Sequence, residues 1–93
     1  MHNRVLAFVC VLQLATHPVF GQSIPRQRVS SSVIASAGYD RASKILALEF
    51  RQGSIYQYFS VPDRVYAELM TAPSKGKYFH ARIKGRYRFK RVG

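Results

Sequence analysis

Residues 44–59 read KILALEFRQGSIYQYF, two largely apolar segments around the dipeptide Gln52-Gly53. Before the dipeptide, large apolar side chains occupy every second position, at Leu46, Leu48 and Phe50, which is the spacing of one face of a β-strand. The glycine suits a two-residue hairpin turn, because glycine accepts the positive φ that such a turn requires. The residues after it are rich in aromatic side chains, which favour strands. The stretch therefore predicts an antiparallel β-hairpin.

A two-residue turn also sets the register of this hairpin, with Arg51 opposite Ser54. In that register one face is nearly all apolar, and we expect it to be buried together with the apolar stripe of a following helix. The expected core is Leu46, Leu48, Phe50, Ile55, Phe59, Val65 and Leu69. The opposite face then carries Tyr56 and Tyr58 beside charged side chains.

The segments on either side of the hairpin extend the fold. Residues 32–39, SVIASAGY, precede it as a further strand, since they combine small and β-branched side chains. After it, Ser60 and Asp63 have the spacing of a capping box and predict the start of a helix at 61–71. Pro73 then prevents the helix from continuing.

A second helix and a last strand complete the predicted elements. Ser74 suits the cap of a helix at 75–84, and Gly85 suits the left-handed residue that ends it. Residues 86–92, RYRFKRV, alternate basic and aromatic side chains as a short strand does. The predicted fold class is α+β, with a small three-stranded antiparallel sheet at 32–59, two short helices at 61–71 and 75–84, and a short basic C-terminal strand.

Residues 1–21 follow the order of a signal peptide, with a short positive start, the apolar run Val5–Ala15 and a cleavage site at Gly21. The apolar run is about half of the ~20 residues that a membrane-spanning helix needs. An alternative is a lipoprotein anchored through Cys10, but this cysteine comes early in the apolar run. We expect an exported protein, periplasmic or secreted, with a signal peptide at 1–21, a linker at 22–30 and a single domain at 31–93.

The composition limits the classes of function. The 93 residues include 15 Lys and Arg but only 4 Asp and Glu, for a formal net charge of +11. A chain of this length forms one small domain and has little material for the walls of a deep substrate cleft. The scarcity of carboxylates argues against carboxylate-rich metal sites and two-carboxylate catalysis. We therefore expect no enzyme activity, no metal and no cofactor.

Several separated motifs in the predicted domain resemble the KTSC domain, a short module found alone in many bacterial proteins and at the C-terminus of some lysyl-tRNA synthetases. The resemblance covers about Ser31 to Val92. It rests on Ser31-Ser32, Ile34, Gly38-Tyr39-Asp40, Leu48-Glu49-Phe50, Gly53, Tyr56-Gln57-Tyr58, Val61-Pro62, Tyr66, Leu69, Ser74 to Phe79, Ile83 and Tyr87. The synthetase context of the family implies RNA binding as a role, whereas the predicted export signal here departs from its cytosolic members.

The start of the second helix is a candidate anion site. Ser74, Lys75, Gly76 and Lys77 combine free backbone N–H groups, the positive end of the helix dipole, a small residue and two ammonium groups. The upstream glycine of a P-loop is missing. The alternative is an ordinary helix cap with solvated lysines.

Basic and aromatic side chains also suggest contact with a polyanion. From Lys75 to Gly93 the chain has eight Lys and Arg and no acid, and we expect Lys84, Arg86 and Arg88 to attract phosphates. Tyr56 and Tyr58 suit a platform on which bases stack. The alternatives are a solvated basic face and tyrosines that belong to the core.

Three functions remain open at this point. The first is an exported, non-enzymatic binding module that meets an anionic polymer or surface, such as nucleic acid or the phosphates of a membrane or envelope. The second is a module that docks an acidic protein partner. The third is a small nuclease-like enzyme in which His80 acts as a base with Glu49 or Glu68.

Overall fold

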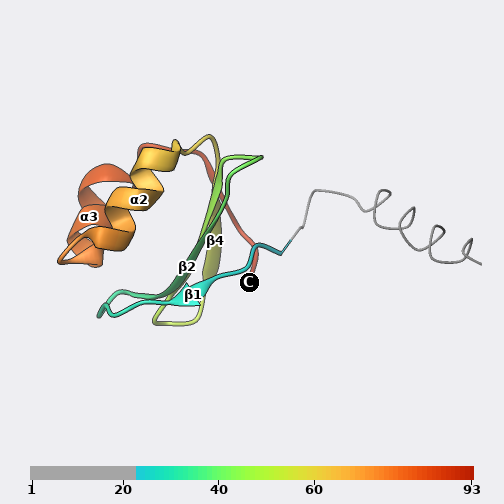
Figure 1. The fold of residues 1–93 in the computed structure, drawn as a ribbon. Coiled ribbons are helices and arrows are strands. Elements are labelled where there is room, and N and C mark those ends of the chain that lie inside the picture. Colours follow the sequence, from blue (N-terminus) through green and yellow to red (C-terminus); the bar gives the residue numbers. More distant parts are fainter. Residues whose placement is uncertain (1–22) are drawn as a thin grey trace, which may run out of the picture.

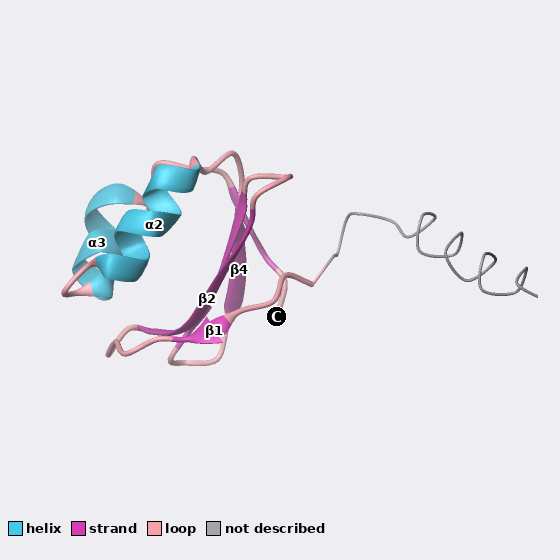
Figure 2. Ribbon diagram, in the orientation of Figure 1, coloured by secondary structure: helices cyan, strands magenta, loops and turns pink. Residues whose placement is uncertain are grey.

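A five-stranded antiparallel sheet forms one of the two layers of the fold (Figure 1), and its strands lie in the order in which they occur along the chain. The computed structural model describes residues 23–93. The strands are β1 (Gln27–Arg28), β2 (Ile34–Asp40), β3 (Ile45–Phe50), β4 (Ile55–Tyr58) and β5 (Phe89–Arg91). The helices α2 (Asp63–Thr71) and α3 (Lys75–Arg82) follow β4 and lie together on one face of the sheet (Figure 2). The predicted α+β class and the order of the predicted elements are confirmed, but the sheet has five strands rather than three because β1 and β5 join it.

The core lies between this face of the sheet and the two helices. Leu46 and Leu48 on β3 and Leu69 on α2 are fully buried, as expected from their apolar spacing. The buried cluster comprises Ile34, Ala37, Leu46, Leu48, Tyr58, Val61, Val65, Leu69, Phe79 and Ile83. A single face of the sheet therefore provides most of the apolar contacts of the helices. No helix within residues 23–93 has the length and apolar character needed to cross a membrane.

The predicted register of the β3–β4 hairpin is wrong by one residue. The N–H of Phe50 donates to the carbonyl of Ser54 at 2.9 Å, and the N–H of Gly53 donates to the carbonyl of Phe50 at 2.8 Å. The loop thus has three residues rather than two, and Gly53 takes the positive φ (110°) at its third position. Leu48 consequently lies opposite Tyr56, and Leu46 lies opposite Tyr58.

This shift exchanges the two faces of β4, because neighbouring residues of a strand point to opposite sides. Tyr56 and Tyr58 lie on the helix-covered face and join the core or pack against it. Ile55 and Phe59, which we expected in the core, lie on the other face and are only partly buried.

The segment before the sheet contributes a strand, in contrast to the predicted linker at 22–30. Gln27 pairs with Ala37 and Arg28 with Ser36. Ile24 is buried, and a Cβ on Gly38 would lie only 1.9 Å from the carbonyl oxygen of Pro25. The glycine therefore permits close approach of the backbone. The polar sequence does not indicate this strand, because β1 joins the sheet through its backbone and not through apolar side chains.

The helix starts differ in how well the sequence predicts them. α2 has Pro62 as its N-cap and no side-chain cap, so the predicted capping box from Ser60 to Asp63 does not form. Instead, Tyr39 Oη lies 2.9 Å from Oδ1 of Asp63 and also bonds to the carbonyl of Val61. By contrast, Ser74 caps α3 as predicted, accepting from the N–H of Lys77 at 3.3 Å.

The end of α3 follows the prediction with a small difference in length. The helix ends at Arg82 rather than at residue 84. Gly85 has a φ of 79°, as expected for a left-handed residue after a helix. The chain then turns back and pairs β5 with β4, so that Phe89 lies opposite Tyr58. The predicted basic strand is thus an edge strand of the sheet.

Candidate functional site

A hollow of about 540 Å³ lies between strands β4 and β5 and the end of α3. Most of its surface is apolar. We call it the aromatic groove, and its principal side chains are Tyr56, Tyr58, Phe79, His80, Lys84 and Phe89. Since β4 and β5 are neighbours in the sheet and α3 packs over them, three segments distant in sequence meet here.

The aromatic rings of this groove form one contact cluster. The ring centroid of Phe89 lies 5.6 Å from that of Tyr56 and 5.8 Å from that of Tyr58. Phe79 meets Tyr58 edge to face at 5.8 Å. Such separations are typical of favourable aromatic pairs. The cluster therefore holds its rings in fixed positions from two strands and a helix.

Only part of the cluster is open to a ligand. Phe89 is 58% exposed, the largest exposure of any large hydrophobic residue in the described chain, whereas Tyr58 and Phe79 are each 5% exposed. Tyr56 is half-buried. Tyr58 therefore belongs to the floor of the groove, and Phe89 with the accessible part of Tyr56 provides the surface on which a flat ligand can stack.

The floor of the groove is neutral. Burial, with a smaller effect of the neighbouring Tyr56, raises the pKa of Tyr58 to about 12. The Tyr58 hydroxyl therefore keeps its proton at neutral pH. Positive charge enters the groove from its rim, where Lys84 is exposed.

Two further predicted cations lie beside the groove. Arg86 and Arg88 border an adjoining hollow that shares Gly85 and Phe89 with it. Nε of Arg86 donates to the carbonyl of Ala81 at 3.1 Å, and the Arg88 guanidinium lies 5.7 Å from the ring centroid of Phe59. The structure thus brings Tyr56, Tyr58 and Lys84 into one hollow and places Arg86 next to it, whereas the Arg88 guanidinium lies with Phe59 on the other face of the sheet.

The predicted anion cradle at Ser74, Lys75, Gly76 and Lys77 lies at the other end of α3. A Cβ on Gly76 would lie 2.7 Å from Cγ2 of Val33, so this glycine allows the helix to approach the sheet segment. Nζ of Lys75 donates to the carbonyl of Ala72 at 3.2 Å and satisfies the end of α2. Gly76 and the Lys75 ammonium group therefore have structural roles. None of the four residues lines the aromatic groove.

His80 lies at the groove, with its ring 5.4 Å from that of Phe79. The two carboxylates considered as its partners bond elsewhere. Glu49 accepts from Ser36 at 2.8 Å, and Glu68 accepts from the hydroxyl of Tyr78 at 2.6 Å. Within residues 23–93, no cluster of three or more His, Cys, Asp and Glu side chains is arranged to hold a metal. Cys10 and the predicted cleavage site lie outside the described residues.

The sequence prediction did not include Phe89 among the site residues. Its alternation with basic residues is visible in residues 86–92, and the strand prediction there is sound. However, its proximity to Tyr56 depends on the pairing of β5 with β4 and on the corrected hairpin register. No local sequence pattern indicates the β5–β4 pairing or the correct hairpin register.

Comparison with known proteins gives consistent matches. The pattern of the KTSC domain matches residues 30–87. A crystal structure of a KTSC domain protein from Yersinia pestis is 44% identical, with a TM-score of 0.72, and the match covers 76% of this chain and 100% of that one. A protein from Tsukamurella paurometabola is 45% identical over 62 residues, 67% of this chain and 92% of the relative.

A larger protein contains a similar segment. The lysine–tRNA ligase of Nostoc sp. is 43% identical over 70 residues. The match covers 75% of this chain but only 12% of the ligase. The chain therefore corresponds to a small part of that enzyme.

Proposed function

This chain belongs to the KTSC domain family, and from that premise we propose that it is a non-enzymatic module that binds single-stranded nucleic acid in the aromatic groove. The observation that carries the proposal is Phe89, an edge-strand ring that is 58% exposed although it packs against two tyrosines. Because the ring packs against two tyrosines, its exposed face is held in a fixed position and is open to a stacking ligand.

The chemistry of the groove fits an unpaired base. A base stacked on an aromatic side chain contributes roughly 1–3 kcal/mol of binding free energy, and stacking needs a base that is not paired within a duplex. We infer that Lys84 at the rim and Arg86 beside it attract the phosphates on either side of that base. A lipid phosphate would use the same cations but would gain nothing from stacking.

The surrounding charge supports the same class of ligand. Residues 75–93 contain no acid, so no carboxylate within this segment repels a phosphate backbone. The similarity to a segment of a lysine–tRNA ligase supports RNA as the first nucleic acid to test. On the signal peptide predicted at 1–21 we also propose that the protein acts outside the cytoplasm, where RNA, DNA or envelope phosphates are the candidate polyanions.

The test is the salt dependence of binding, measured by fluorescence anisotropy with a labelled single-stranded RNA. For single strands, log K falls with log salt by about 0.7 for each phosphate contact. Lys84→Gln and Arg86→Gln should each weaken binding and reduce the slope by about that amount. Arg64→Gln on α2 is the matched control, because it removes the same charge at an exposed position away from the groove.

Several results would contradict the proposal. Absence of RNA binding at low salt would contradict the proposal. If the two groove substitutions and the Arg64→Gln control weaken binding equally, the RNA is attracted by net charge alone. Stronger binding to anionic vesicles than to RNA would favour a membrane surface. Stoichiometric, salt-resistant binding to one acidic protein would favour the docking alternative, and cleavage of the RNA would favour an enzyme.

A further inference from the structure

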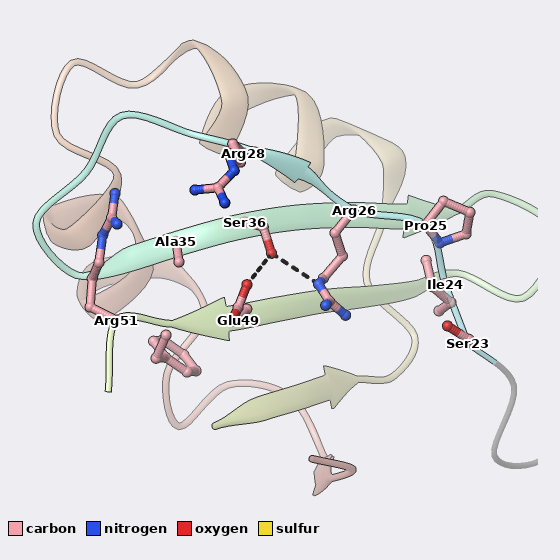
Figure 3. A pocket seen from close by; sticks show the side chains of 10 residues that line it. Ser23, Ile24, Pro25, Arg26, Arg28, Ala35, Ser36, Glu49 and Arg51 are labelled. Carbon is pink, nitrogen blue, oxygen red and sulfur yellow. Dashed lines mark hydrogen bonds between the residues drawn. The ribbon is translucent and has the colours of Figure 1, made fainter. Parts of the chain in front are cut away.

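A second hollow, of about 600 Å³, lies on the face of the sheet away from the helices (Figure 3). It is largely polar. Three arginines line it together with a serine and a carboxylate, and we call it the arginine pocket: Arg26, Arg28, Arg51, Ser36 and Glu49. We propose that this pocket binds a phosphate group, as a nucleotide phosphate or as free phosphate. The proposal does not depend on the aromatic groove.

The arginine pocket carries more positive than negative charge. Three arginines and one carboxylate line it, and positive charges held close together attract an anion. The other carboxylates of the described chain are engaged elsewhere. Asp63 pairs with Arg41 at 3.6 Å, Asp40 bonds to Ser43, and Glu68 bonds to Tyr78. No second carboxylate within residues 23–93 therefore neutralises the pocket.

A buried hydroxyl fixes one of these arginines. Ser36 is 6% exposed, and its Oγ accepts from Nε of Arg26 at 2.9 Å and donates to Oε1 of Glu49 at 2.8 Å. Figure 3 shows this chain of hydrogen bonds across the pocket. Because Arg26 uses Nε for this bond, its two terminal nitrogens stay available as a fork for an oxyanion.

Arg51 is fixed in a similar way. Its Nε donates to the carbonyl of Ser31 at 3.0 Å, which again leaves the terminal nitrogens for a ligand. Arg28 comes from β1 opposite Ser36, and its guanidinium has no hydrogen bond or ion pair with any residue of the described chain. Figure 3 shows the three arginines spread along β2, with the Ser36–Glu49 pair between Arg26 and Arg51.

Phosphate is the anion that this arrangement suits. Its oxygens accept several hydrogen bonds at once, and guanidinium forks bind them in pairs. The single carboxylate accepts from Ser36, which in turn accepts from Arg26, so we expect the phosphate to bind near Arg28 and Arg51.

The experiment is a titration of the isotope-labelled protein with inorganic phosphate at constant ionic strength, followed by NMR of the arginine Nε–H and backbone amide signals. We expect saturable shifts of the Arg28 and Arg51 side-chain signals and of the Ser36 amide. Arg28→Gln should abolish them with little effect on folding, because Arg28 is exposed and has no side-chain partner in the described chain. Arg51→Gln should weaken them.

Two controls separate this site from the aromatic groove. Arg86→Gln and Phe89→Ala should leave the phosphate shifts unchanged, so that loss of RNA binding and loss of phosphate binding are distinguishable. Shifts without saturation, or shifts of equal size at Arg64, would overturn the proposal. Adenosine monophosphate assigns the source: affinity at least tenfold above that of inorganic phosphate indicates a nucleotide, and equal affinity indicates free phosphate.

Discussion

Tyr58 connects the core with the floor of the groove, and its hydroxyl makes the stability of the domain depend on pH. Burial raises its pKa to about 12, above the value of about 10 for an unfolded tyrosine. The folded chain therefore keeps a proton that the unfolded chain releases between these values. The stabilisation is complete below pH 10 and is lost as the pH rises through about 12.

The corresponding prediction compares the wild type with Tyr58→Phe. Between pH 10 and pH 12 the unfolding free energy of the wild type should fall relative to that of the variant by up to about 1.4 kcal/mol per pH unit. Urea unfolding of both proteins at pH 8, 10 and 11 measures this. A constant difference between them across the series would mean that Tyr58 is not desolvated.

At the scale of the element, sequence patterns predicted which residues form strands and helices better than they predicted how these elements pair and pack. The Ser74 cap of α3 could be predicted because a capping serine lies directly before its helix in the sequence. The hairpin register depended on whether the loop has two or three residues, and Gly53 is compatible with both. The predicted tyrosine platform consequently lay on the wrong face of the sheet.

Strand β1 shows the same limit. Its two residues form hydrogen bonds that any side chains would allow, so neither Gln27 nor Arg28 signals a strand. The informative residue is Gly38 on the neighbouring strand, whose missing side chain makes room for Pro25. For the same reason, Arg26 and Arg28 could not be recognised as pocket residues from a segment that resembles a linker.

Gly38→Ala tests this account of β1. The new methyl group would meet the Pro25 carbonyl oxygen at 1.9 Å, and backbone cannot yield as a flexible side chain does. We expect residues 24–28 to detach from the sheet. Hydrogen exchange should then become faster at the amides of Val29 and of β1, while the amides of α2 and α3 keep their protection. Unchanged exchange at Val29 would contradict the packing described for Gly38.

At the scale of the whole molecule, the predicted processing must preserve the residues that pack on the sheet. Cleavage after Gly21 would keep Ile24, which is buried, and the Pro25 backbone against Gly38. The predicted export then implies that N-terminal sequencing of the processed protein finds a start near Gln22. Recovery of Met1, of a lipidated Cys10, or of a start beyond Ile24 would contradict this prediction.

The central claim is that the exposed ring of Phe89 binds an unpaired base, and a pair of substitutions in the C-terminal segment tests it most directly. Phe89 and Val92 are the two exposed large hydrophobic residues of the described chain, at 58% and 42%, and only Phe89 lines the groove. The measurement is the affinity of Phe89→Ala and Val92→Ala for one single-stranded RNA at fixed salt, with thermal unfolding as the check on folding. We predict that Phe89→Ala loses roughly 1–3 kcal/mol of binding free energy while Val92→Ala binds as the wild type does. Equal affinity of the two folded variants would contradict the account.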